Sequence, residues 1–138
     1  MAIKTYKPTS PSRRNITGIN YRDVLTATEP HKALTFGRKR HVGRNNNGRI
    51  TAPHKGGGHK RLYREIDFKM EKINIPARIE TVEYDPNRSA FIGLVCYADG
   101  ERRYMVLPQA VTVGTTVITS AEAPLTPGNR LPLVNIPV

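Results

Sequence analysis

The residues of this chain best suited to chemistry are basic side chains interleaved with asparagine and glycine. Their expected role is to bind an anion. The clearest case is the stretch Gly43–Arg49, with the letters GRNNNGR. Asn and Gly tolerate left-handed backbone conformations, so the chain can turn tightly there. The amides offer donors and acceptors that fit base edges and sugar hydroxyls, while Arg44 and Arg49 can clamp phosphates. A flexible Asn-rich loop is the alternative interpretation.

A glycine-rich stretch follows at His54–Arg61, with the letters HKGGGHKR. Its spacing is not that of the nucleotide-binding P-loop, which needs a Lys and a Ser or Thr after the last Gly and a helix beyond. The three glycines instead let backbone amides approach a phosphate backbone closely, and the flanking Lys and Arg side chains add charge. A plain linker is the alternative, and both roles can hold together. His54 and His59 lack the further ligands that a metal site needs.

Shorter basic runs complete the candidate interface. The run Arg38–His41 and the pair Arg13-Arg14 favour phosphate contact because they belong to a strongly basic segment. Arg102 and Arg103 are adjacent in an expected strand, so their side chains point to opposite faces and at most one meets a given partner. A surface ion pair with Glu101 is the alternative for either. The candidate nucleic-acid-binding residues are Arg13, Arg14, Arg38, Lys39, Arg40, Arg44, Asn45, Asn46, Asn47, Arg49, His54, Lys55, Gly57, His59, Lys60, Arg61, Arg64, Arg88, Arg102 and Arg103.

Catalytic and metal chemistry find no support in the sequence. The single cysteine, Cys96, belongs to an apolar run and is expected to be a small buried hydrophobe, which leaves no Cys/His nucleophilic pair. Asp85 and Asp99 belong to turn sequences, and the Ser and Thr residues lack nucleophile-elbow spacing. One Cys with four scattered His does not make a structural zinc site. We therefore expect no enzyme, no cofactor and no metal.

The positive charge is confined to the first half of the chain. Up to Arg64 there are fifteen Lys and Arg against two acids, a net of +13, and from Glu65 onward seven bases face nine acids. Charge that served solubility alone would be spread evenly, so this split indicates a polyanionic partner, with nucleic acid the leading candidate. No stretch approaches the ~20 consecutive apolar residues of a membrane span, so no membrane partner is expected.

The elements that must position these bases divide into two parts. Residues 1–61 carry scattered prolines and clustered glycines with few large apolar residues, which predicts an irregular, extended basic arm. Self-burial there is too small to offset an ordering cost of ~1–2 kcal/mol per residue, so we expect the arm to be disordered alone and ordered by its partner.

Residues 62–138 read as short strands. An alternating pattern begins at Leu62, and a change of parity between Ile79 and Val82 predicts a bulge that helps a sheet to curl. Residues 90–97 are apolar on both faces, as in a central strand, and the Asp99-Gly100 pair predicts a hairpin. The expected fold class is all-β, a small OB-fold-like barrel preceded by the long irregular arm, with a sandwich fragment as the alternative.

Taken in order, the motifs closely resemble those of bacterial-type large-subunit ribosomal protein two. Any one of them is weak, whereas their order and spacing over nearly the whole chain are specific. They are residues 8–14 (PTSPSRR), 43–51 (GRNNNGRIT), 56–60 (GGGHK), 83–90 (EYDPNRSA), 99–104 (DGERRY) and 135–137 (NIP).

The resemblance implies an arm and an OB-fold-like domain that both bind large-subunit ribosomal RNA, as a structural constituent that supports assembly and translation. It implies other ribosomal proteins as partners and a location in the large ribosomal subunit, either in the bacterial cytoplasm or inside an organelle. In that family an SH3-like barrel and a basic tail follow. Their absence here suggests a split gene or a shortened polypeptide, with a separate polypeptide carrying the missing domain as a further partner.

Two other function classes stay open from the residues alone. A general single-strand-binding OB-fold protein would stack bases on exposed barrel aromatics such as Tyr97 and Tyr104. A protein-interaction module with an incidental basic tail would bind its partner without strong salt dependence, whereas an RNA binder would lose affinity steeply as salt rises.

Overall fold

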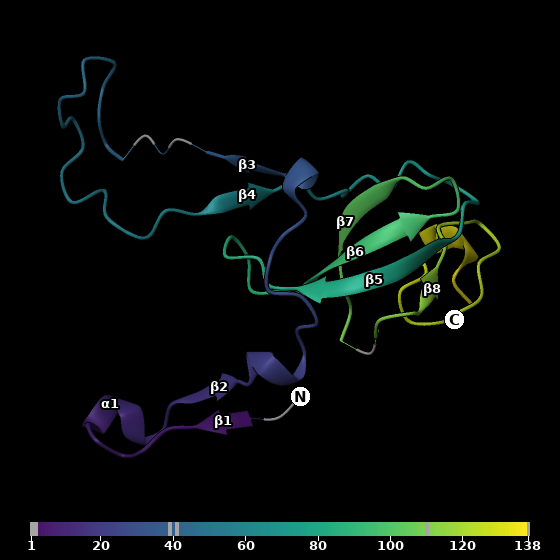
Figure 1. Cartoon of the computed structure of the whole chain (residues 1–138), viewed down its shortest axis with the longest axis horizontal. Helices are drawn as coiled ribbons and strands as arrows, with labels where there is room; N and C mark the ends of the chain where they lie inside the picture. The colour runs from purple at the N-terminus through teal and green to yellow at the C-terminus, as the bar shows by residue number, and fades with distance from the viewer. Residues whose placement is uncertain (1–2, 39, 41, 110, 138) are drawn as a thin grey trace.

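The structure is a computed structural model that describes residues 3–38, 40, 42–109 and 111–137. It consists of a small β body from which two hairpins project on the same side (Figure 1). The body is all-β and OB-fold-like, as predicted from the strand pattern.

The body is built on one curled antiparallel sheet. Its strands are β5 (Ala77–Glu83), β6 (Ile92–Tyr97), β7 (Arg102–Val106) and β8 (Thr116–Val117), in the order β7-β6-β5-β8. The register between β5 and β6 shifts between residues 79 and 81, which confirms the bulge predicted from the change of parity. A bulge increases local twist, and here it bends the longest strand around the core.

Two buried clusters hold the sheet together. The larger includes Ile79, Val95 and Met105, and the smaller gathers Ile92 and Tyr104 with their neighbours. Strand β6 is buried on both faces except near Cys96, as expected for a central strand. Burial of a large aliphatic side chain contributes roughly 1.5–3 kcal/mol, so this strand supplies much of the stability of the body.

The expected arm contains two short hairpins as well as irregular backbone. The first pairs β1 (Ile3–Thr5) with β2 (Thr17–Ile19) and carries one helical turn, α1 (Pro11–Arg14), which has Pro at its first position. The second pairs β3 (Thr35–Gly37) with β4 (Leu62–Arg64) across a long loop, residues 38–61. The pairing in the second hairpin joins residues almost thirty positions apart, which no local pattern reveals.

The chain between these hairpins is fastened to the body. The backbone N–H of Thr26 donates to the Val82 carbonyl at 3.0 Å, and its hydroxyl accepts from the Val82 N–H at 2.8 Å. The backbone N–H of His31 donates to the hydroxyl of the fully buried Tyr104 at 2.7 Å. That hydroxyl in turn donates to Glu83 at 2.7 Å. The buried Tyr104 hydroxyl thus accepts its N–H donor only when this part of the chain is in place.

Some expected elements are shorter than predicted. The strand expected from Leu62 onward ends at Arg64, after which Ile66 makes a single parallel bridge to Tyr104. The Val- and Thr-rich stretch after residue 110 yields only β8 and isolated bridges. The described residues also include three 3-10 turns, η1 (Tyr21–Asp23), η2 (Lys32–Leu34) and η3 (Leu133–Asn135). None of the helices in the described ranges is long and apolar enough to cross a membrane.

Candidate nucleic-acid interface

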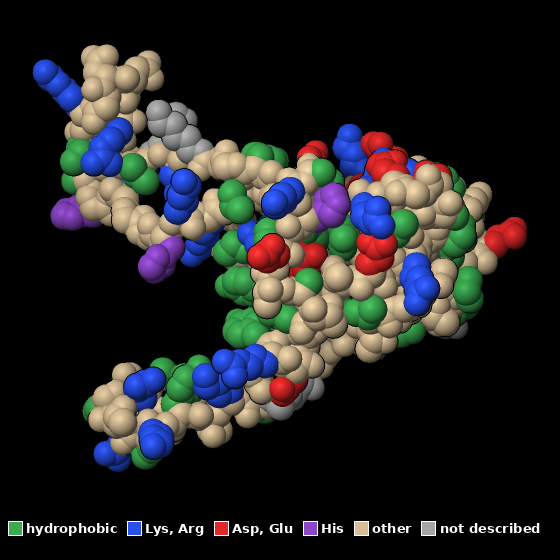
Figure 2. All heavy atoms as spheres, viewed as in Figure 1, with side chains coloured by type: hydrophobic (Ala, Val, Ile, Leu, Met, Phe, Trp, Pro, Cys, Tyr) green, Lys and Arg blue, Asp and Glu red, His purple; other side chains and the backbone are tan. Residues whose placement is uncertain are grey.

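The two hairpins carry bases that have no acidic partner in the described structure. Lys and Arg side chains run along both projecting parts, while acidic side chains gather mostly on the body (Figure 2). Of the ion pairs between described residues, every one lies within residues 65–138. The positive charge of the hairpins is therefore free to meet phosphates, because no carboxylate of the described chain neutralises it.

The Asn-rich loop is a tight turn organised by one of its own side chains. The Oδ1 atom of Asn45 accepts the backbone N–H groups of Asn47 and Arg49 at 3.0 and 2.9 Å. The Asn45 backbone N–H also donates to the Arg49 carbonyl at 2.9 Å. Asn45 therefore shapes the turn, which leaves the exposed amides of Asn46 and Asn47 available to a partner.

Gly43 closes the base of this turn. Its φ is +71°, and a Cβ there would lie 2.4 Å from the carbonyl oxygen of Ala52. Its own carbonyl accepts the N–H groups of Thr51 and Ala52 at 2.8 and 3.1 Å. The close approach of these two segments needs a residue without a side chain, so Gly43 fixes the path by which the loop returns.

The loop returns through three glycines in the left-handed region. The φ values of Gly56, Gly57 and Gly58 are +133°, +69° and +81°. A Cβ on Gly58 would lie 3.3 Å from a guanidinium nitrogen of Arg40, so the returning chain passes close to the outgoing one. The glycine-rich stretch is thus a bend in the basic loop, and its exposed backbone can be approached closely.

A basic groove of about 750 Å³ lies where the second hairpin meets the body. From the hairpin and its loop it is lined by the bases Arg38, Arg40, Lys55 and Arg61, together with Val42, Gly56, Gly57 and Tyr63. From the body it is lined by Asn87 and Arg88, in the turn between β5 and β6. The sequence therefore predicted the basic residues that line this groove, but not its other lining residues Val42, Gly56, Tyr63 and Asn87.

One aromatic ring, Tyr63, lines the hairpin side of the groove. It packs against Phe36 across β3 and β4, with ring centroids 5.0 Å apart. The Arg38 guanidinium lies 6.0 Å from the Tyr63 ring centroid. Tyr63 is not among the site residues predicted from the sequence, because its place in the groove depends on the long-range pairing of β3 with β4.

The body side of the groove is organised by one buried carboxylate. Asp85 is fully buried and accepts the Arg88 Nε at 2.6 Å and the Asn87 side-chain amide at 2.9 Å. That amide also donates to the Leu62 carbonyl at 2.9 Å, and Arg61 donates to the Pro86 carbonyl at 2.8 Å. These bonds tie the turn to the base of the second hairpin. Arg88 is half-buried, yet it still lines the groove.

The first hairpin presents a separate basic surface. The Arg13 guanidinium lies 5.6 Å from the Tyr6 ring centroid, and the Lys4 ammonium lies 5.3 Å from it. Arg14 is exposed in the same turn of helix. Cation–π contacts leave the charge uncompensated, so these side chains remain able to bind phosphate.

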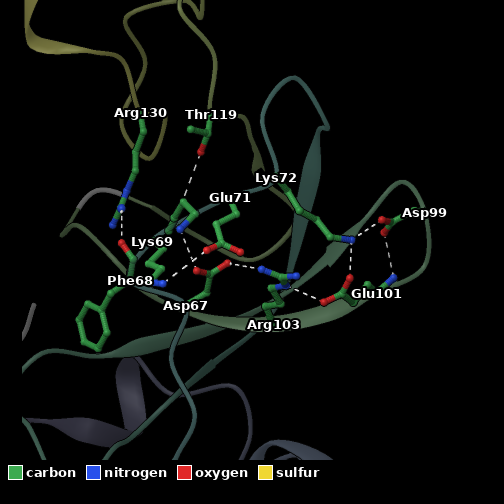
Figure 3. Close-up of polar contacts among 11 residues, drawn as sticks. Asp67, Phe68, Lys69, Glu71, Lys72, Asp99, Glu101, Arg103, Thr119 and Arg130 are labelled. Carbon is green, nitrogen blue, oxygen red and sulfur yellow. Dashed lines mark hydrogen bonds and ion pairs between the residues drawn. The ribbon is translucent and has the colours of Figure 1, made fainter.

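The bases of β7 have acidic partners instead. Arg102 makes two hydrogen bonds to Glu80, at 2.8 and 3.0 Å. Arg103 lies between Asp67 and Glu101, at 2.8 and 2.6 Å, and Lys72 reaches Asp99 and Glu101 (Figure 3). Arg103 therefore makes the ion pair with Glu101 given above as the alternative, whereas the partner of Arg102 is Glu80.

The pKa values of this network follow from its contacts. The hydrogen bond from Arg103 and then that from Lys72 lower the pKa of the Glu101 carboxyl. Burial acts to raise the pKa of Asp67, but hydrogen bonds from Arg103 and the Met70 backbone outweigh it and lower the value. All of these groups are charged at neutral pH, so the β7 surface is a nearly neutral mosaic with little attraction for a polyanion.

The remaining predicted residues are placed as follows. Arg64 is buried, and one of its guanidinium nitrogens donates to the Leu62 carbonyl at 2.9 Å, so it is not open to a partner. Lys39 lies outside the described residues. Five further predicted residues of the long loop are exposed, namely Arg44, Arg49, His54, His59 and Lys60. His54 and His59 gain no further ligand, since no group of three metal-binding side chains occurs among the residues described.

Comparison with known proteins finds one matching family and several similar relatives. The family described as "Ribosomal Proteins L2, RNA binding N-terminal domain" matches residues 31–119. All 138 residues are similar to the large ribosomal subunit protein uL2 of Albidiferax ferrireducens, at 55% identity, and of Hyphomonas neptunium, at 56%. That of Polaromonas naphthalenivorans is 53% identical. Each match covers 100% of this chain and 50% of the relative, so the chain spans about half the length of these curated relatives.

Proposed function

The chain belongs to the ribosomal protein L2 family, and we propose that it is a structural constituent of the large ribosomal subunit that binds and stabilises large-subunit rRNA. The observation that carries the proposal is the separation of charge. The described bases of the hairpins have no acidic partner among the described residues, whereas the bases of β7 are paired within the body. The role is binding and scaffolding, without catalysis, and its location is the ribosome.

The chemistry of binding is the replacement of counterions by side chains. Each Lys or Arg that contacts a phosphate releases the ions condensed on the RNA, and affinity then depends steeply on salt. The exposed amides of Asn46 and Asn47 add contacts to base edges or 2′-hydroxyls. We assign phosphate contact to the exposed bases of both hairpins and of the groove, including Arg88, and we leave out the buried Arg64.

We propose that the division between RNA-binding arm and body falls near residue 61, with one qualification. The contacts of Thr26, His31 and Leu34 with the body make the middle of the arm part of the folded unit. The loop between residues 38 and 61 and the first hairpin are then the parts that RNA orders.

A general single-strand-binding role has weaker support. Such proteins stack bases on exposed aromatic side chains of the barrel. In the body Tyr97 is buried and Tyr104 has no exposed surface, so neither can serve as a stacking platform. The exposed aromatic side chains of the body are Phe68 and Tyr84, so this role would depend on those two rings.

The test is binding of the full chain to fragments that tile large-subunit rRNA, measured against unrelated RNAs of the same length at physiological salt. We expect one folded rRNA region to bind far more tightly than the unrelated RNAs. Equal affinity for all RNAs would refute the proposal. Other ribosomal proteins, and a polypeptide corresponding to the remaining half of the relatives, are proposed partners that co-purification with large subunits would detect.

A further inference from the structure

We propose that the basic groove receives unpaired nucleotides of the RNA, with a base stacked against Tyr63 or Arg38. This inference rests on the proposed function and names the part of the RNA that the groove takes. It depends on three features of the groove, namely its size, its aromatic side and its mixture of charge and amide groups.

The size of the groove fits a small ligand better than the surface of a helix. Its volume of about 750 Å³ falls within the range of pockets that enclose ligands of drug size. In a double helix each base is stacked and paired, so it presents only its edges to a protein. Unpaired nucleotides can be splayed out, and a base can then enter a concave site and offer its face.

The aromatic side of the groove offers a stacking surface. Tyr63 is half-buried against Phe36, which holds the ring in place while one part of it lines the groove. The guanidinium of Arg38 lies close to the same ring and lines the same groove. Bases in single-stranded RNA stack on aromatic rings and on guanidinium planes alike. A base therefore finds two suitable surfaces side by side.

The rest of the lining suits the other parts of a nucleotide. Arg40 and Lys55 are exposed bases without an acidic partner among the described residues, and they can hold the phosphates that flank the base. Asn87 uses its side-chain N–H groups on Leu62 and Asp85, which leaves its carbonyl oxygen to accept from a base edge. The backbone at Gly56 and Gly57 has no side chain to block a strand passing over it.

The first hairpin lacks this combination and provides the matched control. Tyr6 also lies beneath basic side chains, Lys4 and Arg13, but it does not line the groove. Both tyrosines should therefore respond alike if only nearby charge matters. They should respond differently if the groove receives a base.

The first experiment compares a stem-loop RNA that has a short bulge of unpaired nucleotides with the same stem fully paired. We expect the full chain to prefer the bulged RNA. Tyr63→Leu should weaken binding of the bulged RNA by about 5- to 150-fold, the loss of one stacked base, with little effect on the paired RNA. Tyr63→Phe should retain the preference, and Tyr6→Leu should leave it unchanged. Equal binding of the two RNAs by the unaltered chain, or an equal loss for both with Tyr63→Leu, would overturn the inference.

A second measurement does not depend on removing the ring, in case Tyr63→Leu disturbs its contact with Phe36. The chain with p-benzoylphenylalanine in place of Tyr63 is bound to the tightest rRNA fragment and photo-crosslinked, and the attached nucleotide is compared with chemical probing of the free fragment. We expect the crosslink on an unpaired nucleotide, and a crosslink within a continuous helix would count against the groove. Failure of the proposed function would appear separately, as rRNA fragments that bind no better than unrelated RNA.

Discussion

Removal of two groove charges should change the salt dependence of RNA binding by a predictable amount. Arg40 and Lys55 are exposed, line the groove and have no acidic partner among the described residues. Each therefore counts as one phosphate contact. The logarithm of affinity falls with the logarithm of salt concentration with a slope of about 0.7–0.9 per contact. The double variant R40Q/K55Q should thus have a slope smaller by about 1.4–1.8.

This difference is large enough to measure directly. Between about 50 and 200 mM salt, the unaltered chain should lose about 7- to 12-fold more affinity than the double variant. The assay is a titration of a labelled rRNA fragment at several salt concentrations, with fluorescence anisotropy as the signal.

The matched control is Arg102→Gln, because Arg102 is bonded twice to Glu80 and belongs to the neutral surface of β7. It should leave the slope unchanged. An unchanged slope in R40Q/K55Q, or an equal decrease with Arg102→Gln, would show that the groove is not where the RNA lies.

Three further outcomes follow from the same contacts. Asp85→Asn should lower the free energy of unfolding by about 3–5 kcal/mol in urea titrations, because it leaves a half-buried arginine without its buried partner, and an unchanged midpoint would contradict this. Gly43→Ala should weaken RNA binding without a comparable loss of thermal stability, since the new Cβ would meet the Ala52 carbonyl within the loop, and equal losses of both would contradict it. Asp99 and Glu101 have pKa values lowered by their basic partners. The stability that these two carboxylates contribute is therefore present above their ordinary pKa values of 3.8 and 4.5, and it is lost as the pH falls below those values. Urea midpoints from pH 6 down to about 3 would test this, and an equal fall of the midpoints in D99N/E101Q would refute it.

The strands of the body could be predicted because short patterns in the sequence indicate them. The change of parity around residue 80 indicated the bulge, and the Asp99-Gly100 pair indicated the hairpin between β6 and β7. The end of β4 could not be foreseen, because it depends on Ile66 turning toward Tyr104 and not on any breaker in the sequence. Tertiary contact decided that boundary.

The sequence predicted which charged residues belong to the candidate site, but not how these residues are arranged. The sequence identified as candidates all five bases that line the groove, which are Arg38, Arg40, Lys55, Arg61 and Arg88. The ring of Tyr63 and the amide of Asn87 became part of the site only through pairing with residues far along the chain. Arg88 and Arg102 are both paired with an acid, Asp85 and Glu80, and only the tertiary structure shows that Arg88 also lines the groove.

The distribution of ion pairs also explains why the groove can stay open before RNA binds. Like charges on the two hairpins repel one another and gain nothing by packing together. The surface of β7 has already neutralised its own acids through Arg102, Arg103 and Lys72, so it offers the arm no attraction. Contacts of His31 and its neighbours and of Arg61 fasten the arm to the body, while the basic ends of the two hairpins project away from it (Figure 1). RNA supplies the charge that these ends lack, which is why binding and ordering of the arm are expected to occur together.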